Sequence, residues 1–167
     1  MIEAMRTRLG FQDISTAYGM TETSGIVMYT LRGDPDELVS TTSGCVIDDV
    51  EVRIVDEHGN DVPVGQPGEL YVRGYQVTPG YLLGDGGVTK ATDDDGWLHT
   101  GDVVVMNDVG YIDITDRIKD MYIVGGFNAY PAEIERMMVE HPEIGIAAVI
   151  GVPEARLGEV GAALDRK

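Results

Sequence analysis

One short run of this sequence places a hydroxyl and a carboxylate side by side between two glycines. Residues 18–25 read Tyr-Gly-Met-Thr-Glu-Thr-Ser-Gly, so Thr21 and Glu22 are neighbours. A threonine hydroxyl can donate to a phosphate oxygen, and a glutamate can bind a hard cation such as Mg²⁺. A threonine followed by a glutamate also suits the capped start of a helix. The residues alone leave both interpretations open.

A second candidate is the carboxylate that ends the run 97–102, Trp-Leu-His-Thr-Gly-Asp. Asp102 follows a glycine at the start of an apolar stretch. Such an aspartate can accept hydrogen bonds from two vicinal hydroxyls, as an acidic residue does with ribose in dinucleotide sites. The alternative is a turn aspartate that caps its own backbone.

Opposite charges alternate in the run 116–120, Asp-Arg-Ile-Lys-Asp, between two apolar runs. By composition this segment is a charged linker exposed to solvent. Gly125 and Gly126 follow it. Paired glycines allow a ligand to approach the backbone closely, although they also form ordinary turns.

The elements that must position these residues are mostly strands. Residues 1–10 have a mild helical pattern, and 13–18 lead into a glycine as a strand leads into a loop. Alternating apolar residues predict half-buried strands at 48–56 and 69–73, joined by a turn-rich segment. This part reads as a small antiparallel β region, and the segment 80–96 after it reads as a loop.

The C-terminal third predicts a separate α+β unit. Residues 103–106 and 111–114 form a predicted hairpin about a glycine-containing turn, and 117–124 add an extended run. Pro131 suits the first turn of a helix that Pro142 ends. Residues 147–152 then have the length and composition of a strand, so the fold class is α+β.

Composition excludes several classes of protein. The chain has 167 residues, 43% of them hydrophobic, which is enough for one domain or for one domain and part of another. With 29 acidic and 12 basic residues its formal charge is −17, which disfavours nucleic acid and anionic lipid. No apolar run reaches membrane-spanning length and no signal peptide opens the chain, so we expect a cytoplasmic protein. The single cysteine and the absence of Cys/His clusters make structural zinc unexpected.

Taken together, the motifs resemble in content and order the adenylate-forming family, which includes the AMP-forming acyl-CoA synthetases. The resemblance covers residues 14–161 and rests on the following runs: the Tyr-Gly-Met-Thr-Glu loop, 68–74 with Gly80-Tyr81, 96–102, Gly110-Tyr111, 116–120 and 125–135. It implies the β-rich portion of a large adenylate-forming domain, followed by the start of a small α+β C-terminal lid. The implied boundaries are 1–116 for the large domain, 117–119 for a hinge and 120–167 for the incomplete lid.

The resemblance implies roles for single residues of the first motif. Tyr18 would stack on adenine, with Gly19 also in the ATP site. Thr21 would contact the α-phosphate, and Glu22 would bind Mg²⁺. Beside them, Ala17, Met20 and Ile26 are candidates for the acyl pocket.

Further roles are implied toward the C-terminus. Asp102 would take the ribose hydroxyls, and Arg117 would lie near the same ribose and phosphate. Lys119 would be the catalytic hinge about which the lid swings, and Gly125 and Gly126 would approach the pantetheine of coenzyme A.

The implied reaction uses ATP, Mg²⁺ and coenzyme A on a small carboxylic acid. The carboxylate attacks the α-phosphate to give acyl-AMP and pyrophosphate, and after the lid rotates the CoA thiol displaces AMP. The run 124–133 looks most like bacterial fatty-acid and steroid-side-chain CoA ligases. The alternatives are a fatty acyl-AMP ligase that passes the acyl group to a carrier protein, and a non-catalytic remnant or interaction module.

Two expected lysines are missing. The family's Ser/Thr/Gly-rich phosphate loop with its lysine would lie upstream of residue 14, and its catalytic lysine would follow residue 161 by several tens of residues; Lys167 does not match that motif. We therefore expect an internal to C-terminal fragment that binds nucleotide weakly, does not adenylate alone, and exposes edges that favour aggregation or homo-oligomers.

Overall fold

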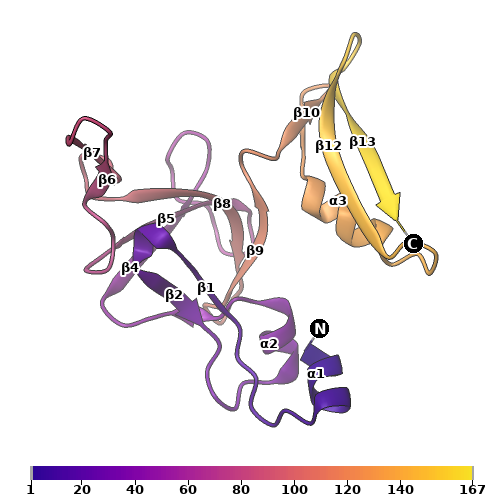
Figure 1. The fold of residues 1–167 in the computed structure, drawn as a ribbon, viewed down its shortest axis with the longest axis horizontal. Coiled ribbons are helices and arrows are strands. Elements are labelled where there is room, and N and C mark those ends of the chain that lie inside the picture. The colour runs from indigo at the N-terminus through magenta and orange to yellow at the C-terminus, as the bar shows by residue number, and fades with distance from the viewer. Residues whose placement is uncertain (1, 167) are drawn as a thin grey trace. The chain divides into compact units, whose positions relative to one another are not determined.

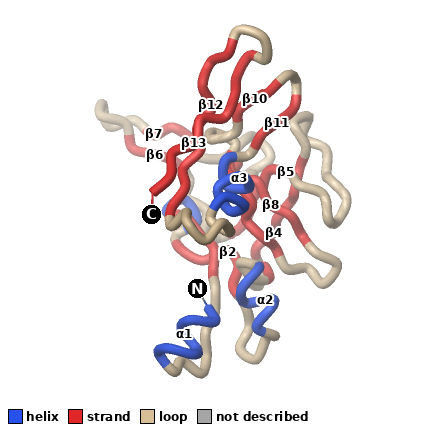
Figure 2. Tube along the Cα trace, turned by 90° about the vertical axis from the view of Figure 1, so that its right-hand side faces the viewer, coloured by secondary structure: helices blue, strands red, loops and turns tan. Residues whose placement is uncertain are grey.

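The computed structural model describes residues 2–166, which form two compact units. The first unit contains the residues up to 100 together with 104–114, and the second contains 101–103 and the residues from 115 onward. Figure 1 gives the order of the elements, and Figure 2 shows that strands make up most of the regular structure. The predicted class, a β-rich portion followed by a small α+β portion, is confirmed.

The first unit begins with a short helix and a three-stranded antiparallel sheet of order β1-β2-β3. Its elements are α1 (Ile2–Leu9), β1 (Ala17–Met20), the 3₁₀ turn η1 (Thr21–Thr23), β2 (Gly25–Tyr29), α2 (Asp36–Thr41) and β3 (Cys45–Val46). The predicted change from strand to loop at residue 18 was wrong, because β1 continues through Gly19 and Met20. Gly19 lies opposite Ile26 of β2, and that pairing keeps the segment extended.

A second sheet has the order β4-β5-β8-β9. Its strands are β4 (Val50–Val55), β5 (Gly68–Gly74), β8 (Leu98–Met106) and β9 (Ile112–Arg117). β4 and β5 pair antiparallel, from Val50 opposite Gly74 to Val55 opposite Glu69, which confirms the predicted β region. The apolar positions of both sheets meet in one buried cluster of Val27, Met28, Ile54, Leu70, Val72, Val104 and Ile112.

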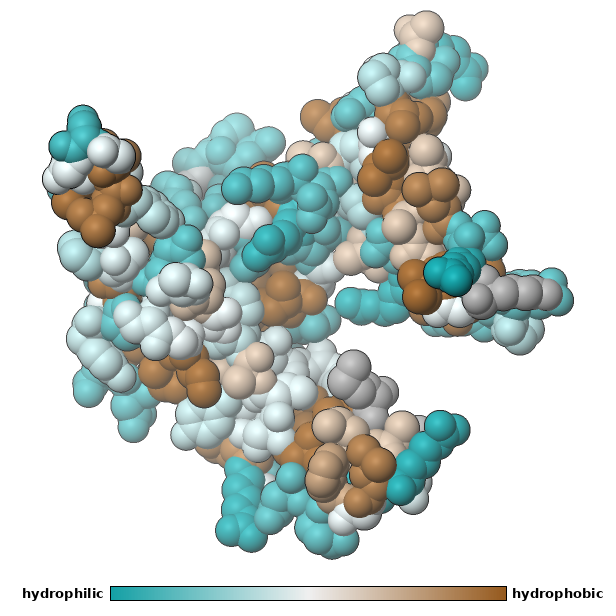
Figure 3. Space-filling view, viewed as in Figure 1, coloured by the Kyte–Doolittle hydropathy of each residue, from teal (hydrophilic) through white to brown (hydrophobic). Residues whose placement is uncertain are grey.

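The segment after β5 contains a small hairpin that was predicted as loop. Its strands are β6 (Gly80–Leu82) and β7 (Val88–Lys90), paired antiparallel. Leu83 donates its backbone N–H to the Gly87 carbonyl at 2.7 Å, and the Asp85 carboxylate accepts from the Gly87 N–H at 2.9 Å. The glycines that suggested irregular chain instead close a tight turn. Figure 3 shows apolar side chains gathered on this hairpin, where Leu82 is 83% exposed.

The second unit is a four-stranded sheet of order β11-β10-β13-β12 with one helix. Its elements are β10 (Tyr122–Val124), β11 (Phe127–Ala129), α3 (Pro131–Met138), β12 (Ile146–Glu154) and β13 (Gly158–Arg166), with α3 against β12. The helix after Pro131 and the strand after residue 146 confirm the prediction. The extended run at 117–124 was only partly right, because Asp120 donates its N–H to the Arg117 carbonyl at 3.1 Å and forms a turn before β10.

Tyr122 is the buried centre of the second unit, with 4% of its surface exposed. Gly151 and Gly161 face each other across β12 and β13. A Cβ atom at either glycine would overlap the Tyr122 side chain. The ring therefore lies over a stretch of sheet kept free of side chains, a known way of packing an aromatic residue against strand glycines.

No helix among the described residues is long and apolar enough to cross a membrane.

A buried tyrosine in the first unit predicts a pH dependence. The Tyr111 hydroxyl donates to the Asp34 carboxylate at 2.8 Å. This hydrogen bond, helped by burial, raises the pKa of Tyr111 from 10.0 to about 12. Because the folded-state pKa is the higher one, the stabilisation is complete below pH 10 and is lost as the pH rises toward about 12.

Tyr111→Phe should therefore flatten the fall in unfolding free energy above pH 10, measured by urea denaturation at a series of pH values. Tyr75→Phe is the control, because the Tyr75 side chain is 76% exposed. Equal pH slopes for the wild-type chain and Tyr111→Phe would contradict the assignment.

Candidate functional site

The loop after β1 presents Thr21 and Glu22 on a turn that Thr23 holds from inside. Thr23 is fully buried. Its hydroxyl oxygen accepts the Met20 N–H at 3.1 Å and donates to the Gly25 carbonyl at 2.9 Å. A Cβ at Gly19 would overlap the Gly25 carbonyl, so only glycine allows the backbones of β1 and β2 to approach this closely.

Of the two interpretations of this loop, the structure favours the one in which Thr21 is not a cap. Met20 occupies the N-cap position of η1, and Thr23 supplies the capping hydroxyl. Thr21 is exposed. Within residues 2–166 its hydroxyl makes no hydrogen bond, and its exposed position makes it accessible to a ligand.

The Glu22 carboxylate is half-buried and contacts a residue far away in sequence. The Tyr81 hydroxyl donates to Glu22 Oε1 at 3.0 Å. The Thr78 N–H donates to the Glu22 carbonyl at 2.7 Å, and the Ser24 hydroxyl donates to the Gln76 carbonyl at 2.8 Å. The segment 76–81 therefore fixes the loop from one side. Sequence reasoning noted Tyr81 only as part of a motif.

The other residues predicted for the first motif lie on β1 and β2. Tyr18 packs against the core cluster, and its hydroxyl is 3.9 Å from Met20 Sδ. Ala17 is opposite Tyr29, and Ile26 on β2 is 51% exposed. Met20 is half-buried at the end of β1, beside Thr21.

Asp102 and Arg117 belong to the second unit and contact each other. Arg117 Nε donates to Asp102 Oδ1 at 2.9 Å, with 4% of the Asp102 side chain and 64% of the Arg117 side chain exposed. A buried carboxylate held by a guanidinium is a fixed acceptor. The exposed part of the guanidinium retains the planar donor geometry that suits phosphate and carboxylate groups.

Asp116 has a structural role that the sequence reasoning missed. It is 7% exposed, and its carboxylate accepts the Arg117 N–H at 2.7 Å and the Ala132 N–H at 3.0 Å. The second bond caps the first turn of α3, whose own N-cap residue, Tyr130, makes no side-chain capping bond. A helix that begins Tyr-Pro without Ser, Thr, Asp or Asn was the signal that its cap comes from elsewhere.

A cavity of about 360 Å³ lies beside this capped helix. It is lined by Asp116, Lys119, Asp120, Glu135 and Glu159, with apolar walls from Tyr122 and Val149. Glu135 accepts the Val149 N–H at 2.7 Å, and Glu159 accepts the Ile123 N–H at 3.0 Å. These carboxylates therefore hold the unit together. Lys119, the predicted hinge, is exposed at the rim of the cavity.

Gly125 and Gly126 form the two-residue turn between β10 and β11. Their φ angles are +59° and +92°, the positive pair that a tight hairpin turn requires. The Gly125 N–H donates to the Leu157 carbonyl at 2.9 Å, and nothing lies within 4 Å of a Cβ built on Gly126. The backbone at Gly126 is therefore open to a ligand.

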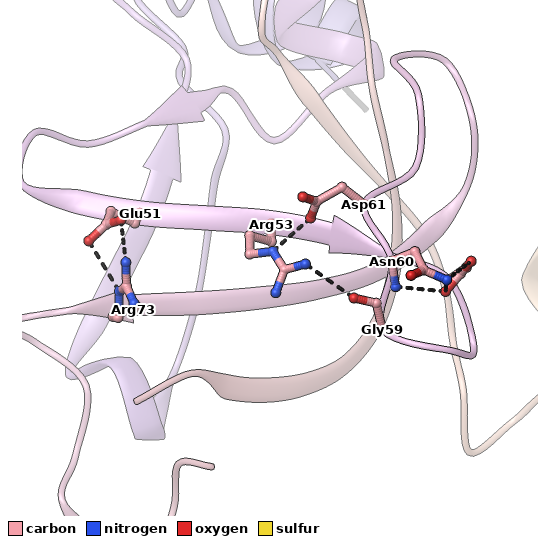
Figure 4. Close-up of polar contacts among 7 residues, drawn as sticks. Glu51, Arg53, Gly59, Asn60, Asp61 and Arg73 are labelled. Carbon is pink, nitrogen blue, oxygen red and sulfur yellow. Dashed lines mark hydrogen bonds and ion pairs between the residues drawn. The ribbon is translucent and has the colours of Figure 1, made fainter. Parts of the chain in front are cut away.

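The arginines on the face of β4 and β5 serve the fold, as Figure 4 shows. Arg73 makes two bonds to Glu51, at 3.2 and 2.6 Å, and lies 4.3 Å from the centre of the Trp97 ring. Arg53 donates to Asp61 at 2.7 Å and to the Gly59 carbonyl at 3.1 Å. The hydrogen bond from Arg73 lowers the pKa of Glu51. Because these cations already have partners, this face is a poor anion site.

The donor set suits a magnesium ion that arrives with a nucleotide. Among the described residues no group of three or more His, Cys, Asp and Glu side chains could hold a metal. Mg²⁺ keeps several waters and is commonly bound by one or two carboxylates together with substrate phosphates. One oriented glutamate, Glu22, beside an available hydroxyl fits that description.

Known proteins resemble this chain along nearly its whole length. The family model described as AMP-binding enzyme matches residues 1–82. A (7a-methyl-1,5-dioxo-octahydro-1H-inden-4-yl)propanoyl:CoA ligase of Rhodococcus jostii is 49% identical over 98% of this chain and 30% of its own length. A long-chain-fatty-acid–CoA ligase of Yersinia pestis is 46% identical over 85% of this chain and 25% of its own length.

A solved structure agrees in fold. The o-succinylbenzoate CoA synthetase of Bacillus subtilis, in complex with its acyl-adenylate intermediate, superposes with a TM-score of 0.82 and 30% identity. The match covers 98% of this chain and 33% of that protein. The chain thus spans about 30% of the length of the first of these curated relatives.

Because the Asp116 carboxylate caps α3, replacing one of its oxygens by an amide nitrogen should lower the free energy of unfolding. Asp116→Asn should leave one of two N–H donors without its acceptor, at a cost of about 1–2 kcal/mol, and should increase amide hydrogen exchange in α3. Asp120→Asn is the matched control, because it removes the same charge from the same segment at an exposed position. Equal exchange in the two variants would show that charge, and not capping, is what matters.

Proposed function

Because the chain belongs to the AMP-binding enzyme family, we propose that it is the nucleotide-handling part of an ATP-dependent carboxylic acid:CoA ligase. The observation that carries the proposal is the loop after β1. Buried Thr23 holds this turn from inside, Thr21 on it is exposed, and the Glu22 carboxylate next to it is held by Tyr81. A donor and a metal-binding acid next to each other are what an attack on the α-phosphate of ATP requires.

Each residue of the loop has a proposed task. Thr21 donates to the α-phosphate, where negative charge builds during the attack of the carboxylate. Glu22 orients the divalent ion, and this ion supplies charge neutralisation at the phosphates when ATP is bound. Tyr18 offers its ring to adenine, and Gly19 lies beside it in the proposed nucleotide site.

Asp102 and Arg117 are proposed to bind the ribose. The buried Asp102 carboxylate is already oriented by Arg117 Nε at 2.9 Å. The exposed guanidinium of Arg117 lies next to this acceptor and suits a neighbouring phosphate oxygen.

The segment 117–119 is proposed as the hinge between a large domain, residues 1–116, and a lid that begins at residue 120. The turn closed by the bond from the Asp120 N–H to the Arg117 carbonyl supports this, because a turn between two strands can absorb backbone rotation. Lys119 lies in this turn. Gly126, whose backbone is open, and Gly125 beside it at the tip of the hairpin are proposed to border the pantetheine of coenzyme A.

The proposed acid is fatty-acid-like, bordered by Ala17, Met20 and Ile26. Support comes from two relatives, which are named as ligases of a long-chain fatty acid and of a propanoyl group on a fused ring. A carrier protein in place of coenzyme A is the alternative acceptor. AMP release by the parent enzyme that requires CoA would separate the two.

The first test asks for binding without turnover. We expect the purified chain to bind ATP weakly, more tightly with Mg²⁺ than with EDTA, in an NMR titration. It should release no pyrophosphate with a panel of fatty acids, because no phosphate-loop lysine precedes the first motif in the printed sequence. Absence of any nucleotide binding would contradict the proposed function, and pyrophosphate release would contradict the expected inactivity.

The second test concerns the ribose. The wild-type chain should bind ATP more tightly than 2′-deoxy-ATP and 3′-deoxy-ATP, because Asp102 loses an acceptor interaction with each analogue. Asp102→Asn should reduce this discrimination by about three- to tenfold while leaving binding of the deoxy analogues nearly unchanged. Asp113→Asn, a change on the same strand pair, should retain full discrimination. A variant Asp102→Asn that still discriminates would refute the ribose role.

A further inference from the structure

We propose that Tyr81 is a positioning residue that fixes the Glu22 carboxylate for binding of the divalent cation. This inference rests on the metal-binding role proposed above for Glu22. It starts from the hydrogen bond that the Tyr81 hydroxyl donates to Glu22 Oε1 at 3.0 Å, between residues 59 positions apart.

The contact is part of a wider attachment between two loops of the first unit. The Thr78 N–H donates to the Glu22 carbonyl at 2.7 Å, so the backbone of Glu22 is held by the same segment that holds its side chain. The Ser24 hydroxyl donates to the Gln76 carbonyl at 2.8 Å. Glu22 is thus bound by Thr78 at its main chain and by Tyr81 at its carboxylate.

The small hairpin of β6 and β7 gives this contact its geometry. Tyr81 is the central residue of β6 and lies opposite Thr89 of β7. A three-residue strand without a partner would leave the tyrosine free to rotate away with its backbone. Pairing with β7 fixes the backbone of Tyr81, and so fixes the direction from which its hydroxyl approaches Glu22.

The geometry leaves one carboxylate oxygen for the cation. Tyr81 bonds to Oε1 of Glu22. Mg²⁺ demands near-octahedral geometry, and a single carboxylate contributes well only if it does not have to be ordered at the moment of binding. A glutamate has three rotatable side-chain bonds, so one anchored oxygen restricts where the other can lie.

Tyr81 remains a donor at neutral pH. The hydrogen bond to Glu22 raises the pKa of the Tyr81 hydroxyl above its ordinary value of 10.0. The phenol therefore keeps its proton at neutral pH and can donate it to Glu22.

The test uses Tyr81→Phe in the whole chain, with Tyr75→Phe as matched control. Tyr75 lies in the same segment, and its side chain is 76% exposed. ATP affinity is measured by NMR titration with Mg²⁺ and with EDTA. We expect Tyr81→Phe to leave the affinity in EDTA unchanged and to reduce the gain produced by Mg²⁺ by about five- to tenfold. Glu22→Gln should remove this gain, and Tyr81→Phe should have no further effect in that background.

A full Mg²⁺-dependent gain in Tyr81→Phe would overturn the inference while leaving the proposed function intact. A wild-type chain without any Mg²⁺-dependent gain would instead refute the role of Glu22 itself.

Discussion

The packing of the β1-β2-β3 sheet against the β4-β5-β8-β9 sheet is the interaction on which the first unit depends. Val27 and Met28 of β2 are fully buried against Leu70 and Val72 of β5, which are also fully buried. Burying side chains of this size contributes about 1.5–3 kcal/mol each. The loop that follows β1 is attached to β2 by Thr23, so the direction of Thr21 and Glu22 is set by a core several residues away. The buried apolar side chains therefore determine where the polar side chains of this loop lie.

Sequence periodicity predicted the parts of the fold that this core dictates. Val50, Val52, Leu70 and Val72 alternate because one face of each strand is buried, and alternation of that kind is visible in the residues themselves. The helix after Pro131 was visible because proline suits the first helical turn and apolar residues recur at helical spacing after it. The β6–β7 hairpin was not, because its pairing depends on a turn closed by backbone bonds between Leu83 and Gly87, and composition alone does not separate such a turn from a loop.

The residues of the candidate site also divide into those that the sequence predicted and those that only the structure shows. Motif order pointed to Thr21, Glu22, Asp102 and Arg117, and the contact between Asp102 and Arg117 is present in the structure. The supporting contacts could not be predicted. Tyr81 meets Glu22 across 59 positions, and Asp116 caps a helix that begins well downstream. Such contacts join residues that share no local pattern, so only the fold brings them together.

The proposed ATP site must overcome the negative charge of the chain. The formal charge of −17 repels a polyphosphate at long range. Two arginines on the first unit cannot help, because Arg53 and Arg73 are occupied by Asp61 and Glu51. On the first unit the groups proposed to act at short range are the Thr21 hydroxyl and a cation oriented by Glu22. In such a site a fixed carboxylate matters more than an additional positive charge, because the cation that neutralises the phosphates can act only where its ligand holds it. The hydrogen bond from Tyr81 is then part of the electrostatics of the site and not merely a structural contact.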